Sequence, residues 1–183
     1  ARVLKDETVR GSIAVAHGGE ASTSTNGFWA SLNIATTERL PLLYYIEDNG
    51  YGISVPAARQ TPGGNIAANL AAFGNLQILS GDSQDPVAAA ALIEAAVKSV
   101  RAGGGPVLLH LRVPRLSGHS GQDTQAYKTP AEISAERDRD PLLALRRLLV
   151  PAELGDAQWL ALEADAEAEV QAALARIEAR API

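Results

Sequence analysis

The feature that most constrains the fold is a strand, helix, strand pattern in which polar residues directly follow each strand. Residues 11–17 form a short apolar run with β-branched side chains, and residues 42–46 form a second one. Between them, apolar residues recur at helical spacing over residues 28–35. Two strands joined by one helix are typical of a parallel sheet, in which ligands bind at the carboxyl ends of the strands.

The same alternation continues along the chain. The sequence predicts a short helix over residues 65–73, a strand over residues 76–79, a long helix over residues 86–101 and a strand that begins near Pro106. This repetition predicts an α/β fold, with a mostly parallel sheet that carries helices on both faces.

After Thr129 the pattern becomes helical. It predicts three helices, over residues 130–137, 141–149 and 156–180. We therefore expect one α/β domain over residues 1–129 and a C-terminal helical extension of the same domain over residues 130–183. A chain of 183 residues is long enough to enclose the core of one domain. The last helix is expected to be a solvated outer element or a docking surface for a partner subunit.

Composition excludes several classes of protein. A net charge of -5 without a basic stripe argues against nucleic acid as a partner. The longest apolar run is interrupted by Glu94 and Lys98, so no membrane span is expected. The absence of cysteine excludes disulfides and thiol catalysis. A secretory signal is not visible, and we expect a cytoplasmic protein.

Polar residues after the first two strands suggest a metal site. Glu20 follows a glycine pair, and Asn49 and Tyr51 follow the second strand. Magnesium usually takes one or two protein carboxylates together with phosphate oxygens and water. The Glu20 carboxylate, the Asn49 side-chain oxygen and a backbone carbonyl near Tyr51 form a candidate set of ligands. Amides at the start of the helix that follows residues 22–26 would face an anion. Taken alone, the Gly-Gly-Glu and Asn-Gly sequences are also common in ordinary turns.

The order of these motifs resembles the α subunits of 2-oxo acid dehydrogenase E1 components, the family of pyruvate and branched-chain 2-oxo acid dehydrogenases. The stretch from Gly19 to Ser54 resembles the thiamine diphosphate motif of that family, which begins Gly-Asp-Gly or Gly-Asp-Ala and ends Asn-Asn-x-Tyr. The resemblance covers nearly the whole chain. It continues through Gln60-Thr61, residues 103–107, the segment from Gly118 to Thr129, and Asp140-Pro141.

The resemblance implies roles for individual residues. Glu20 occupies the position of the magnesium-binding aspartate, Asn49 that of the magnesium-binding asparagine, and Tyr51 would offer its backbone oxygen. His119 matches the active-site histidine of a loop over the cofactor, and Ser120 matches the serine beside it. The residues implied to contact the cofactor are Gly19, Glu20, Ala21, Asn49, Tyr51, Ile53 and His119.

The implied activity is the decarboxylation of a 2-oxo acid on thiamine diphosphate and magnesium, followed by transfer of the acyl group to a lipoyl arm. The implied partners are a β subunit or fused β region, in an α2β2 heterotetramer, and a separate lipoyl-bearing acyltransferase, E2. The α subunits of this family have a long helical region before the thiamine diphosphate motif. We therefore expect the present sequence to be a fragment.

Departures from the family pattern leave alternatives open. Glu20 replaces the usual aspartate, and His110 replaces a usual glutamate. One alternative is a degenerate subunit that keeps the fold and the partner interface without catalysis. Another is a different thiamine diphosphate enzyme, such as a transketolase-like protein, although the His119 loop argues against it. His110 alternates with apolar residues and is expected to be a hydrogen-bonded strand residue. His17 is expected either to contact the ligand or to cap a strand end.

Overall fold

The computed structural model of the protein describes residues 11–180. These residues form two compact units, which divide between Pro141 and Leu142. The first unit contains the sheet and the second is helical. The functional division at residue 129 stays a prediction.

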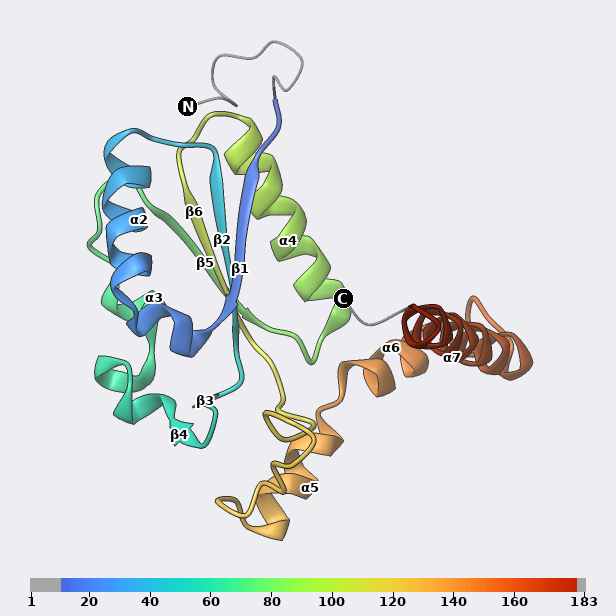
Figure 1. Cartoon of the computed structure of the whole chain (residues 1–183). Coiled ribbons are helices and arrows are strands. Elements are labelled where there is room, and N and C mark those ends of the chain that lie inside the picture. The colour runs from blue at the N-terminus through green and yellow to red at the C-terminus, as the bar shows by residue number, and fades with distance from the viewer. Residues whose placement is uncertain (1–10, 181–183) are drawn as a thin grey trace. The chain divides into compact units, whose positions relative to one another are not determined.

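The first unit is built on a four-stranded parallel sheet (Figure 1). Its strands are β1 (Ala14–Gly19), β2 (Leu42–Asp48), β5 (Gln77–Asp82) and β6 (Val107–Arg112). They lie in the order β1-β2-β6-β5, and every neighbouring pair is parallel. The predicted α/β class is confirmed.

Helices cover both faces of the sheet. Helices α2 (Asn26–Thr37) and α3 (Ile66–Asn69) lie on one face, and α4 (Pro86–Arg101) lies on the other (Figure 1). The chain crosses from β1 to β2 and then to β5 in one direction before it turns back to β6. Right-handed crossovers require the connections made in opposite directions to run over opposite faces, which explains this distribution.

The two central strands are buried on both sides. Tyr44 and Ile46 of β2 pack with Leu108 of β6 against α2 and α3. Leu43 and Leu109 pack with α4 on the opposite face. Burial on both faces explains why the sequences of these strands read as continuous apolar runs.

The first strand continues further than the sequence predicts. Instead of ending at His17, β1 includes both glycines of the expected turn, because Gly18 and Gly19 pair with the neighbouring strand β2. The turn begins two residues later than expected, with the short 3-10 helix η2 (Glu20–Ser24). Glu20 therefore emerges directly from the carboxyl end of β1.

The segment after β2 is more irregular than predicted. It forms a short antiparallel pair, β3 (Tyr51–Gly52) and β4 (Val55–Pro56), followed by the 3-10 helices η3 (Ala57–Arg59) and η4 (Pro62–Gly64). The helix predicted over residues 65–73 is shorter. It begins after the cap at Asn65, whose side chain accepts a hydrogen bond from the N–H of Ala68, and ends at Asn69.

The last helix of the first unit, α5 (Pro130–Asp138), begins with a capping box between Thr129 and Glu132. The second unit contains α6 (Pro141–Leu149), whose first residue precedes the division, and α7 (Asp156–Glu178). Arg146 and Asp156 form an ion pair at 2.8 Å within this unit. Among the helices of residues 11–180, none has the length and apolar character needed to span a membrane.

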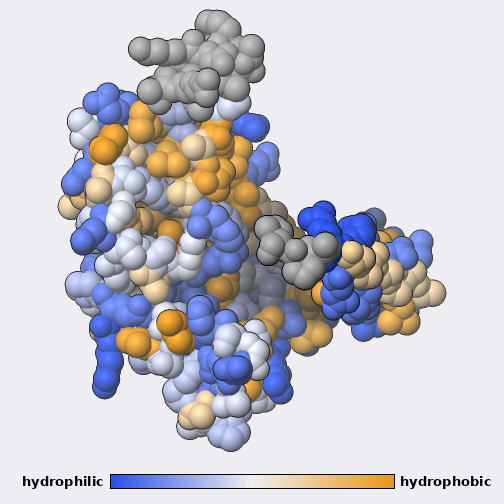
Figure 2. All heavy atoms as spheres, in the orientation of Figure 1, coloured by the Kyte–Doolittle hydropathy of each residue, from blue (hydrophilic) through white to orange (hydrophobic). Residues whose placement is uncertain are grey.

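Strand β1 is an edge of the sheet formed by the described residues. Figure 2 shows apolar side chains gathered over this edge. Val15 of β1 is 56% exposed. This part of the surface thus combines a strand edge with exposed apolar side chains.

Candidate functional site

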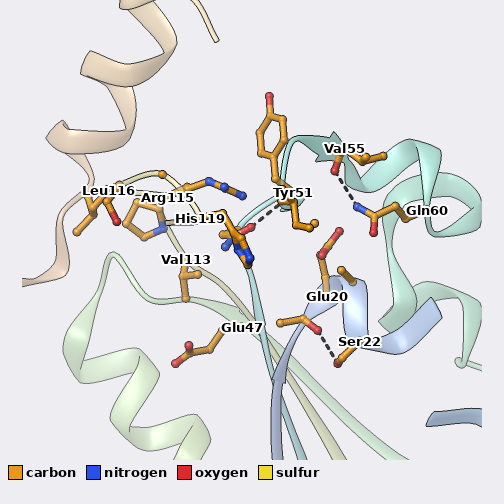
Figure 3. A pocket seen from close by; sticks show the side chains of 18 residues that line it. Glu20, Ser22, Glu47, Tyr51, Val55, Gln60, Val113, Arg115, Leu116 and His119 are labelled. Carbon is orange, nitrogen blue, oxygen red and sulfur yellow. Dashed lines mark hydrogen bonds between the residues drawn. The ribbon is translucent and has the colours of Figure 1, made fainter. Parts of the chain in front are cut away.

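An open cavity of about 740 Å³ lies at the carboxyl ends of the strands, where three loops meet (Figure 3). Its lining comes from residues 19–22 after β1, from the segment after β2, and from residues 113–119 after β6. All of the residues predicted to contact a cofactor line this cavity. They are Gly19, Glu20, Ala21, Asn49, Tyr51, Ile53 and His119.

Glu20 places a buried carboxylate in the wall of the cavity. The residue is 3% exposed, and neither carboxylate oxygen has a hydrogen-bond partner among residues 11–180. Burial raises the pKa of the Glu20 carboxyl above its ordinary value, and the negative charge of Asp48 raises it further. A buried carboxylate without a partner is costly, so this position favours a bound cation or a proton.

The turn after β2 carries the other two candidate metal ligands. The Asn49 side-chain oxygen accepts a hydrogen bond from the Tyr51 N–H at 3.0 Å, which leaves its second lone pair free. Tyr51 and Pro56 face each other as a non-hydrogen-bonded pair, because the adjacent bond runs from the Ala57 N–H to the Gly50 carbonyl at 2.8 Å, so the Tyr51 carbonyl points away from β4. Gly50, which lies between Asn49 and Tyr51, adopts a positive φ of 79°. The Asn49 side-chain oxygen and the Tyr51 carbonyl oxygen therefore keep lone pairs that could bind a metal ion.

These residues fit a magnesium ion held together with a phosphate ligand. Within residues 11–180, no three His, Asp or Glu side chains gather into a metal site of their own. Glu20 is the carboxylate and Asn49 the amide of the predicted set, so phosphate oxygens and water would complete the octahedron. Magnesium commonly binds in this way.

The loops after β1 and β2 are held against each other. The Ser24 hydroxyl donates a hydrogen bond to the Gln60 carbonyl at 3.0 Å. The Gln60 side-chain amide in turn donates to the Val55 carbonyl at 2.7 Å (Figure 3). At Gly52, an added Cβ would come within 2.6 Å of the Ala21 Cβ, so glycine allows the two loops to touch. This contact joins the loop that carries Glu20 to the segment that follows Asn49.

His119 lies in an exposed loop that one carboxylate organises. Asp123 accepts hydrogen bonds from the His119 N–H at 2.7 Å, the Gln125 N–H at 2.9 Å and the Tyr127 hydroxyl at 3.0 Å. The bonds from the His119 and Gln125 N–H groups are the main reason why the pKa of Asp123 falls to about 2. The loop folds back so closely that a side chain at Gly118 would overlap the Asp123 carbonyl. Ser120 is exposed and does not line the cavity.

A cluster of cations and aromatic rings joins this loop to the candidate metal-binding turn. The rings of Tyr51 and Tyr127 lie 5.4 Å apart, and the Arg115 guanidinium lies 5.6 Å from the centre of each ring. The Lys128 ammonium lies 4.8 Å from the Tyr51 ring and 3.7 Å from Glu136 of α5. The His119 loop is thereby fixed to the segment that carries Asn49.

The other two histidines lie outside the cavity. His110 is a buried strand residue whose Nε2 lies 2.9 Å from Asp48 Oδ2, as the sequence predicts for a hydrogen-bonded strand position. His17 lies 3.3 Å from Glu47 and contacts the Tyr45 ring. His17 lines a second, smaller cavity at the start of α2.

The predicted anion site at the start of α2 does not form part of the main cavity. Thr25 and Phe28 line the smaller cavity instead, and the Thr25 hydroxyl accepts the Phe28 N–H at 3.3 Å. The reason is the 3-10 helix η2, which separates β1 from α2 and brings its own residues to the main cavity.

The sequence alone gives little indication that Asp123 and Arg115 help to build the candidate site. An aspartate that follows a Gly/Ser-rich stretch is a recognisable signal for local hydrogen bonds to backbone N–H groups. Its additional contact with Tyr127 and its ion pair with Arg115 at 3.3 Å depend on the folded loop.

A parallel sheet with a cavity at the meeting point of its strand ends defines the class of open α/β ligand-binding domains. Comparison with known families is more specific: the chain belongs to the dehydrogenase E1 component family, whose model matches residues 5–182.

Curated relatives agree with this membership. The pyruvate dehydrogenase E1 component subunit alpha of Zymomonas mobilis is 28% identical over 89% of this chain, and its Staphylococcus aureus counterpart is 28% identical over 76%. The 3-methyl-2-oxobutanoate dehydrogenase subunit alpha of Mycobacterium tuberculosis is 30% identical over 75% of this chain. The chain spans 46%, 38% and 38% of the lengths of these three relatives.

Proposed function

We propose that this chain supplies the α-type part of an E1 component that decarboxylates a 2-oxo acid with thiamine diphosphate and magnesium and passes the acyl group to a lipoyl arm. The observation that carries the proposal is the cavity at the strand ends. Seven residues, selected from three separate segments for their resemblance to cofactor contacts, line it together. One of them, Glu20, is a buried carboxylate with no hydrogen-bond partner among the described residues.

Glu20, Asn49 and the Tyr51 carbonyl would hold magnesium, and the metal would fix the diphosphate. Gly19 and Ala21 bring the backbone of the first loop to the same cavity. When bound, the cofactor supplies the carbon nucleophile and the electron sink for decarboxylation. This chain contributes orientation, and the buried setting strengthens the electrostatic attraction between Glu20 and the metal.

His119 would act at the mouth of the cavity. Its loop lines the cavity, its side chain is exposed, and Asp123 fixes its backbone N–H. In this position the imidazole can exchange a proton with a bound 2-oxo acid and meet an incoming lipoyl arm. The metal-binding residues and the histidine would therefore have separable roles.

A partner chain or a further region of the protein would close the cavity. Three apolar side chains on its lining are exposed: Ile53 by 59%, Val55 by 41% and Leu116 by 38%. Apolar residues around a polar site are typical of a surface that another protein covers. We assign this surface to a β subunit or fused β region, in an α2β2 arrangement, with a lipoyl-bearing acyltransferase as the acyl acceptor.

The names of the relatives suggest the candidate substrates, which are pyruvate and 3-methyl-2-oxobutanoate. Membership of the E1 family favours this activity over a transketolase-like one. A degenerate subunit is the main alternative, because Glu20 and His110 depart from the usual family residues.

The test is release of carbon dioxide from each 2-oxo acid by the complete protein, purified with any chain that accompanies it. We expect activity that requires thiamine diphosphate and magnesium. A His119→Ala variant should lose turnover while it keeps metal-dependent cofactor binding. A complete protein that binds the cofactor but releases no carbon dioxide from either acid would contradict the proposed reaction.

A further inference from the structure

The candidate metal-binding turn is connected to the core of the sheet by a buried pair of side chains. His110 lies on the central strand β6 and is 3% exposed, and Asp48 ends the neighbouring strand β2 with a side chain that is 11% exposed. His110 Nε2 and Asp48 Oδ2 are 2.9 Å apart. Neither residue lines the main cavity.

The two carboxylate oxygens of Asp48 contact different parts of the protein, one the core and the other the turn. Oδ2 contacts His110, and Oδ1 accepts the Gly50 N–H at 2.9 Å. Gly50 is the residue between the two proposed ligands Asn49 and Tyr51. Its own carbonyl accepts the Ala57 N–H at 2.8 Å. A rotation of the Asp48 side chain would therefore break the hydrogen bond to the Gly50 N–H at the centre of the turn.

The backbone of Asp48 also joins the turn to the base of the His119 loop. The backbone carbonyl of Asp48 accepts the Val113 N–H at 2.8 Å, and Val113 begins the segment that leads to His119. Asp48 thus fixes the local geometry of two of the three segments around the cavity. The His110 side chain holds the Asp48 carboxylate through the contact with Oδ2.

We propose that His110 is a positioning residue for magnesium: by holding the Asp48 carboxylate, it keeps the turn of Asn49 and Tyr51 in the geometry that binds the metal. The proposal rests on the proposed function of this cavity. Metal sites commonly depend on such outer partners, whose loss lowers metal affinity by about 10- to 100-fold. A carboxylate that lost His110 would be buried with one oxygen unpaired and would rearrange.

The test compares magnesium affinity in the complete protein by calorimetry at a fixed, saturating concentration of thiamine diphosphate. We expect His110→Leu to weaken magnesium binding by about tenfold or more. His110→Gln, which can still donate a hydrogen bond to Asp48, should stay close to the wild-type protein. Thermal unfolding without ligands verifies that each variant is folded.

A control removes a partly buried hydrogen bond from β2, the strand that carries Asp48, without touching the turn. Tyr44 donates its hydroxyl hydrogen to Ser31 at 3.1 Å, and Tyr44→Phe should leave magnesium affinity unchanged. A double-mutant cycle separates positioning from general packing. In an Asp48→Ala background, His110→Leu should cause no further loss of magnesium affinity.

Two outcomes would overturn the positioning role: unchanged magnesium affinity in His110→Leu, or losses that simply add in the double variant. Failure of the wild-type protein to bind magnesium at all is a different result. It would reject the proposed function itself, and with it any role of His110 in metal binding.

Discussion

At the scale of single residues, Glu20 is the group whose environment most demands a ligand. Its carboxylate is buried, its oxygens are unpartnered within the described chain, and its pKa is raised first by burial and then by Asp48. A raised pKa in the folded state means that the folded protein holds this proton more tightly than the unfolded chain. The contribution of Glu20 to metal-free stability therefore falls as the pH rises above 4.5.

Glu20→Gln should separate stability from metal binding. We expect the variant to lose magnesium affinity by at least about tenfold, since even outer partners of a metal have effects of that size. Its metal-free thermal stability at neutral pH should equal or exceed that of the wild-type protein, because a neutral amide replaces a buried unpaired charge.

Calorimetry and thermal unfolding across a pH series check both parts of this prediction. Glu20→Asp, which keeps the carboxylate, is the matched control and should retain magnesium-dependent binding. A Glu20→Gln protein that binds magnesium normally, or one that is less stable than the wild-type protein at every pH, would contradict the assignment.

Asp123 should show the opposite pH dependence. Its pKa falls from 3.8 to about 2, chiefly through hydrogen bonds from the N–H groups of His119 and Gln125. The stability that these bonds provide is complete above pH 3.8 and is lost as the pH falls toward about 2. Asp123→Asn should therefore be less stable than the wild-type protein at neutral pH.

The difference in stability between Asp123→Asn and the wild-type protein should shrink toward the acid end of this range. Chemical unfolding at a series of pH values measures it. A difference that stays constant from neutral to acid pH would show that the Asp123 charge does not hold the loop.

At the scale of structural elements, the contact between the first two loops determines the shape of the cavity. Gly52→Ala would place a methyl group against the Gln60 side-chain amide and 2.6 Å from the Ala21 Cβ, so the two loops must move apart. Such overpacking costs about 1–3 kcal/mol of folding stability, and we expect the displaced loops to bind the cofactor more weakly.

Gly27→Ala is the control for this change. Gly27 lies in α2, where an added Cβ would meet nothing within 4 Å, and alanine is the better helix former. We expect normal cofactor affinity and equal or higher stability for Gly27→Ala. Equal effects of the two substitutions on binding would show that the contact between the loops is unimportant.

Elements with strong local signals were predictable from the sequence. Helix α4 begins and ends as predicted, because Asp85 caps its first turn at 3.0 Å and Pro86 occupies its first position. The β3–β4 pair was not predicted, since strands of two residues leave no periodicity. The extension of β1 through its glycines was missed because pairing with β2 outweighs their preference for turns.

The candidate site was predictable to a similar extent. The spacing of Glu20, Asn49 and His119 matched a known family motif, and the structure brings all three to one cavity. The supporting contacts of Asp123 with Tyr127, and of Asp48 with His110, were beyond the reach of the sequence pattern. The second pair joins residues 62 positions apart and depends on the adjacency of β2 and β6.

At the scale of the whole molecule, the family membership and the cavity support different parts of the proposed function. The chain belongs to the dehydrogenase E1 component family, and the cavity at the strand ends is the site proposed for its ligand. The apolar lining residues Ile53, Val55 and Leu116 are exposed, which supports our proposal that another chain or region covers this cavity. We propose that magnesium joins Glu20 and Asn49 to a diphosphate cofactor in this cavity.

Calorimetric titration of thiamine diphosphate into the complete assembly, with and without magnesium, tests that claim most directly. The wild-type protein should bind the cofactor tightly only when magnesium is present, and Asn49→Ala should lose this binding while it remains folded. Absence of binding in an intact wild-type assembly, or binding that ignores both magnesium and Asn49, would contradict the account and favour a structural subunit.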